Sequence, residues 1–109
     1  MTRYRHLERR IDRLLARADR RVDAQLLGEM EDVLATGYAY ALAGDAGCRR
    51  LHRRLDALTE DIADEGVAAE VRRLTLEQRA LEDATQKLRA RLASMRELVI
   101  ALGPVCRSS

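Results

Sequence analysis

The chain has 109 residues, and 47% of them are hydrophobic although only three are aromatic. The dominant residues, Leu, Ala, Arg and Glu, form helices that pack in thin layers, so the composition excludes a thick globular core. The length predicts one domain over residues 1–109, and a net charge of +2 without an aromatic stacking surface argues against nucleic acid as the partner.

A first helix is predicted over residues 3–43. Apolar residues recur at steps of three or four from Leu7, Ile11 and Leu14 onward, which gives one continuous apolar face. The alternative is a break in the helix between Asp19 and Asp23.

The charges of this first segment are strongly polarised. Residues 1–21 carry eight arginines against three acids, a net charge of +5, whereas residues 22–47 carry five acids and no base, a net charge of −5. Such a helix can pair with an antiparallel copy of itself, because the basic end of one copy would face the acidic end of the other. Its basic end can equally hold an anion.

A turn is predicted at residues 43–47, which read Ala-Gly-Asp-Ala-Gly. Gly44 and Gly47 can adopt the left-handed conformations that end a helix, and Asp45 can cap the next one. A second helix is then predicted over residues 48–65.

The apolar face changes sides near Gly66. Ile62 and Val71 are nine residues apart, a rotation of about 900° at 3.6 residues per turn, so their side chains would point in opposite directions on a continuous helix. The economical interpretation is that the chain reverses at Gly66. The alternative is one long, kinked helix that forms a two-helix hairpin with the first.

The third predicted helix covers residues 67–102 and has the most regular pattern. Its interior positions follow each other at alternating steps of three and four residues, which is the heptad pattern of a coiled coil. These positions are Val71, Leu74, Gln78, Leu81, Thr85, Leu88, Leu92, Met95, Val99 and Leu102. Such a face needs a partner. The tail 103–109 is expected to be flexible.

The predicted fold class is all-α, an antiparallel helical hairpin or three-helix bundle with coiled-coil packing and a long C-terminal helix. In either topology the last turns of the third helix extend beyond the other helices. Leaving five large apolar side chains in water forfeits about 10 kcal/mol, so we expect an obligate homo-oligomer, most simply a dimer, or another protein in the same place. The predicted interface consists of Leu81, Leu88, Leu92, Met95, Val99, Leu102, Leu7, Ile11 and Leu14.

Arginine clusters are the candidate binding sites for an anion. Guanidinium groups on the first helix, and on one outward face of the third, could hold a phosphate by paired hydrogen bonds. The candidates are Arg9, Arg10, Arg13, Arg17, Arg72 and Arg79. Glu8, Asp12 and Asp19 interrupt the first of these tracts, which again argues against a nucleic-acid partner.

The sequence offers no catalytic or cofactor motif. Cys48 and His52 share one helical face, but zinc sites need two such short-spaced pairs, so we expect no metal, no cofactor and no enzymatic activity. The two cysteines lie far apart, and no apolar stretch reaches the ~20 residues of a membrane span. A cytoplasmic protein without a membrane partner is therefore expected.

These observations together predict a non-enzymatic, self-associating coiled-coil module that binds another protein, as a small bacterial adaptor or regulator. The alternative function is an arginine-mediated binder of nucleic acid or of a small, nucleotide-like anion.

Overall fold

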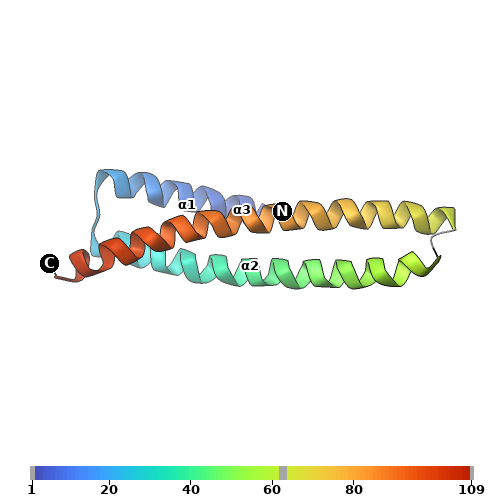
Figure 1. Cartoon of the computed structure of the whole chain (residues 1–109). Helices are drawn as coiled ribbons and strands as arrows, with labels where there is room; N and C mark the ends of the chain where they lie inside the picture. Colours follow the sequence, from blue (N-terminus) through green and yellow to red (C-terminus); the bar gives the residue numbers. More distant parts are fainter. Residues whose placement is uncertain (1, 62–63, 109) are drawn as a thin grey trace.

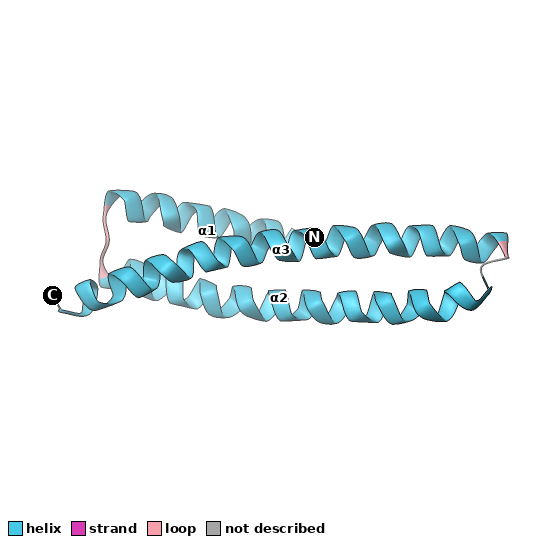
Figure 2. Ribbon diagram, in the orientation of Figure 1, coloured by secondary structure: helices cyan, strands magenta, loops and turns pink. Residues whose placement is uncertain are grey.

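The computed structural model describes residues 2–61 and 64–108, and all of these except residues 21–23 and Asp64 are helical. The helices are α1 (Thr2–Arg20), α2 (Ala24–Leu58), the short 3-10 helix η1 (Thr59–Asp61) and α3 (Glu65–Ser108). Figure 2 shows that the chain leaves helix only at its two reversals. The predicted fold class is confirmed: the protein is an all-α bundle of three main helices, the last of them the longest.

α2 and α3 form an antiparallel hairpin along the whole molecule, which measures 67 × 18 × 15 Å. α1 folds back onto only one half of this hairpin, so the N-terminus lies near the middle of the rod (Figure 1). The rod therefore has three helices at one end and two at the other. We call the two-helix part, residues 47–58 and 65–81, the arm.

The hydrophobic core lies in the three-helix half. Each buried side chain there contributes about 1.5–3 kcal/mol, and α1 supplies three of them. The core consists of Leu7, Ile11, Leu14, Leu26, Met30, Val33, Ala41, Leu88, Leu92 and Met95. The arm has a thinner seam, in which Leu74 is buried and its neighbours are only half-buried.

The predicted first helix over residues 3–43 is wrong, and the alternative break between Asp19 and Asp23 is confirmed. Asp23 has an extended backbone, and its carboxylate accepts a hydrogen bond of 2.8 Å from the Leu26 N–H, so it caps the start of α2. The break lies at the charge boundary of the sequence. The basic segment thus packs antiparallel against the acidic one within a single chain, where Arg17 lies 2.5 Å from Glu29.

The predicted turn at residues 43–47 is also wrong, because α2 runs through it without interruption. The glycines serve close packing and not a left-handed turn, since no described residue has a positive φ. A Cβ atom at Gly44 would overlap the hydroxyl of Tyr4 and would lie 2.5 Å from the Thr85 hydroxyl. A Cβ atom at Gly37 would likewise overlap Leu92.

The predicted reversal near Gly66 is confirmed, a few residues earlier than expected. α2 ends at Leu58 and α3 begins at Glu65, so Gly66 lies in the first turn of α3 and not at the end of the preceding helix. Its N–H donates a hydrogen bond of 2.8 Å to the carboxylate of Asp64, which caps the new helix. Ile62, on which the prediction drew, is outside the described residues.

The predicted flexible tail over residues 103–109 is wrong as far as Ser108. α3 continues through Pro104 to Ser108, and Gly103 is buried. Gly37 lies against Leu92 and Gly44 against Thr85, a register that places the end of α3 level with the start of α2. The start of α2 therefore supports the end of α3, as Figure 1 shows.

The residues predicted as an intermolecular interface mostly lie inside the chain's own core. Leu7, Ile11, Leu14, Leu88, Leu92 and Met95 are buried, whereas Leu81, Val99 and Leu102 are half-buried. The premise that these side chains lack an intrachain partner is wrong, because the chain reverses after Arg20 and α1, α2 and α3 pack together in one core. The argument for an obligate oligomer fails with that premise, and the oligomeric state stays a prediction.

Candidate functional site

The N-terminal end of α1 is fixed between α2 and α3 by a pair of hydroxyl groups. Tyr4 donates a hydrogen bond of 3.0 Å to the Tyr40 carbonyl oxygen, and its own oxygen lies 3.2 Å from the Thr85 hydroxyl. Thr85, a polar residue in the heptad pattern, is only 3% exposed. Because Tyr4 satisfies this buried hydroxyl, the first turn of α1 is held at one level of the hairpin.

An apolar cavity of about 330 Å³ opens at the N-terminal end of α1. Its floor is the groove between α2 and α3, and small residues of α2 keep that groove deep. We call it the α1-end pocket, and it is lined by Thr2, Arg3, Tyr4, Tyr40, Ala43, Gly44, Gly47, Arg50 and Leu81. Arg3 and Arg50 are exposed at its rim, and neither forms an ion pair within residues 2–61 and 64–108.

From the α1-end pocket toward the tip of the arm, the same side of the hairpin carries charged side chains. Tyr40, Gly47 and Arg54 are seven residues apart, so they share one face of α2, the face that α1 contacts through Tyr4. Arg54 reaches across the seam to Glu70, with 3.3 Å between the guanidinium and the carboxylate. The apolar groove is therefore open over the α1-end pocket and bridged by charged side chains farther out.

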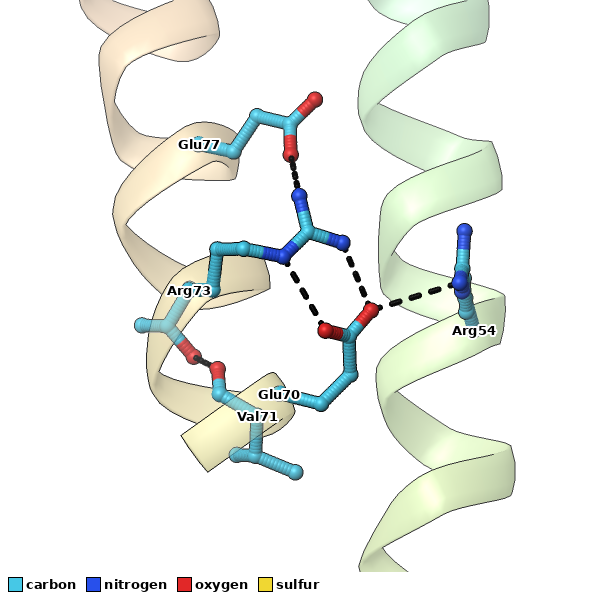
Figure 3. A network of polar contacts seen from close by, with 6 residues as sticks. Arg54, Glu70, Val71, Arg73 and Glu77 are labelled. Carbon is cyan, nitrogen blue, oxygen red and sulfur yellow. Dashed lines mark hydrogen bonds and ion pairs between the residues drawn. The ribbon is translucent and has the colours of Figure 1, made fainter. Parts of the chain in front are cut away.

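This bridge belongs to a network of four side chains, shown in Figure 3. Arg73 donates two hydrogen bonds to Glu70, of 2.6 and 3.0 Å, and a third of 3.2 Å to Glu77. The hydrogen bond from Arg73 lowers the pKa of Glu70, and the same pairing raises the pKa of Arg73. The network is exposed, so it fixes the outer surface of the arm without adding much stability.

A polar groove of about 560 Å³ lies on the other side of the seam. Burial, and then the nearby carboxylates of Glu82 and Asp45, raise the pKa of the Cys48 thiol, so this cysteine stays protonated at neutral pH. Arg89 pairs with Asp45 in the same groove. The groove thus presents a protonated thiol and a satisfied ion pair. Among the described residues, no three His, Cys, Asp or Glu side chains gather as metal ligands.

The predicted anion-binding arginines do not form one site. Arg9, Arg10, Arg13 and Arg17 lie on α1, which packs alongside α3 from Thr85 onward. Arg72 and Arg79 are exposed on the arm, before that level. The two groups are therefore separate surfaces.

The α1-end pocket was not predicted from the sequence, because Gly44 and Gly47 were assigned to a turn. Two signals in the sequence could have located it. The net charge changes sign after Arg21, and Asp23 stands three residues before Leu26, as a helix cap does. Both signals place the end of the first helix where the structure has it.

Comparisons with protein-family models, with curated proteins and with solved structures find no match to this chain. Within residues 2–61 and 64–108, no helix has an apolar stretch of the length that crossing a bilayer requires. The class that the fold defines is an elongated three-helix rod with a two-helix arm.

Proposed function

We propose that the protein is a non-enzymatic adaptor that binds an amphipathic segment of another protein in the α1-end pocket. One observation supports this most directly: α1 fills the groove between α2 and α3 only as far as Tyr4, and the groove stays open and apolar beyond it. A helix in a groove is a common mode of peptide recognition. The partner's segment would extend the line of α1 over Gly47 and Leu81.

The rim of the pocket defines the chemistry of the partner. Arg3 and Arg50 are both exposed, and the charges nearest to them in the pocket lining are each other's. An acidic residue on either side of an apolar side chain would meet these guanidinium groups, whereas a lysine or arginine would be repelled. A cavity of about 330 Å³ is at the small end of ligand sites, so it suits one or two bulky side chains.

The protonation state of the Cys48 thiol favours binding over catalysis. The pKa of Cys48 is raised, which suppresses the thiolate that nucleophilic catalysis needs. The pocket itself is lined by apolar faces, hydroxyl groups and two guanidinium groups, and these can hold a ligand by packing and hydrogen bonds.

The experiment uses two designed helical peptides with the same leucine stripe, one flanked by glutamates and one by lysines. Binding to the full chain is followed by amide chemical shifts in NMR spectra. The acidic peptide should shift Gly44, Gly47 and Leu81, and it should bind at least about tenfold more tightly than the basic one.

Two variants of α2 make the test specific. Ala43→Trp places a large ring at the pocket and should abolish binding, whereas Ala35→Trp, on an exposed position away from the lining, should leave it intact. Equal binding by both variants would refute the proposal, as would shifts confined to the groove around Cys48. Sedimentation equilibrium tests whether a second copy of the chain occupies the pocket. If the parent chain is a dimer and Ala43→Trp dissociates it, a second copy fills the pocket instead of another protein.

A further inference from the structure

The charges of α1 are sorted onto opposite edges of the helix. Two rows of basic residues, each with a heptad spacing, run along the helix. The row at the α2 edge is Arg3, Arg10 and Arg17, and the row on the outer side is His6, Arg13 and Arg20. Arg17 marks the α2 edge because it pairs with Glu29. Asp12 marks the α3 edge because it pairs with Arg91, and Asp19 is one heptad farther along that edge. Asp12 and Asp19, two of the three acids that interrupt the basic tract in sequence, therefore do not interrupt it on the surface.

The two basic rows, together with Arg9 beside them, form what we call the basic stripe. Its arginines are all exposed, and within the described part of the chain only Arg17 forms an ion pair. Glu29, Glu31 and Asp32 are the acids of α2 nearest to the stripe in sequence, so the six arginines outnumber these carboxylates by three. This local excess is larger than the net charge of +2 of the whole chain.

The surface between α1 and α2 is hollowed under the stripe. One cavity of about 220 Å³ is lined by Arg10, Arg13, Leu14, Arg17 and Glu29. A second, of about 230 Å³, is lined by Arg3, His6, Leu7, Arg10, Thr36 and Tyr40. Arg10 lines both, so guanidinium groups surround two adjacent hollows along the same edge. Each hollow can seat a phosphate with donors on more than one side.

We propose that the basic stripe binds the phosphate backbone of a nucleic acid without reading its sequence. Arg3 and Arg20 are 17 residues apart, so the stripe is about 25 Å long at 1.5 Å per residue. That length covers most of one turn of a DNA duplex, along which phosphates are closely spaced. Guanidinium forks match phosphate geometry, and the stripe has no aromatic side chain to stack on a base.

A membrane surface fits the stripe less well. Helices that lie on membranes insert a face of large apolar side chains, but the apolar face of α1 is buried through Leu7, Ile11 and Leu14. Among the residues whose burial the structure describes, the exposed large hydrophobic side chains are Val22, Leu42, Leu76, Ile100 and Val105, and none of them is in α1. Attraction to the basic stripe is therefore only electrostatic. This favours a nucleic acid over a membrane surface, because the nucleic acid carries the denser charge.

The test measures fluorescence anisotropy of a labelled 20-base-pair DNA duplex with the full chain between about 50 and 200 mM salt. About three phosphate contacts predict a slope of log K against log salt near −2.7. The double variant Arg10→Gln/Arg13→Gln should reduce that slope by about two and weaken binding at 50 mM at least about tenfold. Neither residue lines the α1-end pocket, so this result is independent of the proposed function.

The matched control is Arg72→Gln/Arg79→Gln, which removes the same charge from exposed positions on the arm. It should change the affinity by less than about twofold, and circular dichroism should show that both variants remain folded. Equal losses in the two variants would overturn the proposal, since net charge alone would then explain binding. Absence of duplex binding, together with binding to phosphatidylserine vesicles, would overturn it in favour of a membrane surface.

Discussion

The same substitution at two glycines of α2 should have opposite effects on stability. Gly28 has no heavy atom within 4 Å of the place where a Cβ would stand, so Gly28→Ala only improves helix propensity. That gain is about 1 kcal/mol. At Gly37 the same gain is opposed by Leu92, whose side chain is 0% exposed and whose Cγ would lie 3.2 Å from the new Cβ.

The magnitude at Gly37 follows from the lack of free space around Leu92. Overpacking a buried site costs about 1–3 kcal/mol. With the propensity gain subtracted, Gly37→Ala should lower the free energy of unfolding by about 0–2 kcal/mol, while Gly28→Ala raises it by about 1. For a domain of this size, 1 kcal/mol corresponds to about 4–8 °C in Tm, so the two variants should melt on opposite sides of the parent chain.

Urea unfolding followed by circular dichroism measures both variants, and a third variant tests the cause. Leu92→Ala alone should cost about 2–5 kcal/mol, and in that background Gly37→Ala should become stabilising because its methyl group enters the new space. If Gly37→Ala stabilises the parent chain as much as Gly28→Ala does, α2 and α3 do not approach each other closely at this level, and the reasoning fails.

Three further predictions concern caps, charges and the thiol. Asp23→Ala should lower stability by about 0.5–2 kcal/mol in thermal melts while Asp23→Asn retains most of it, and equal melting of all three chains would contradict the capping role. Replacing Glu29, Glu31 and Asp32 with Gln should destabilise the chain at low salt and much less above about 0.5 M, because the match with α1 is electrostatic; the same loss at both salts would show another cause. Iodoacetamide should alkylate Cys48 at pH 8 more slowly than it alkylates glutathione, because the raised pKa leaves less thiolate, and a faster reaction would count against the burial described.

The heptad pattern of α3 could be predicted from the sequence because its spacing reports directly on burial. Leu74, Leu88, Leu92 and Met95 are buried as their positions in the pattern indicate. The reversal near Gly66 could also be predicted, since the change of apolar face forces either a turn or a second partner.

The path of the first 47 residues could not be predicted from periodicity, because two antiparallel helices can carry the same apolar spacing as one long helix. Glycine adds a second ambiguity. Gly44 can end a helix or allow two helices to approach, and only the presence of Tyr4 and Thr85 opposite it decides between these roles. The α1-end pocket depends on both of these features, so it could not be predicted from the sequence.

The arm is tied to the rest of the rod only through its own two helices. The Arg54–Glu70 bridge lies beyond Tyr40 and Thr85, the residues that hold the first turn of α1. Seven residues added to α2 after Arg54, with seven more added to α3 before Glu70, would move the tip outward by about 10 Å and leave every helix face in phase. The distance between the tip of the arm and the α1-end pocket can therefore change in steps of one heptad while the pocket stays unchanged.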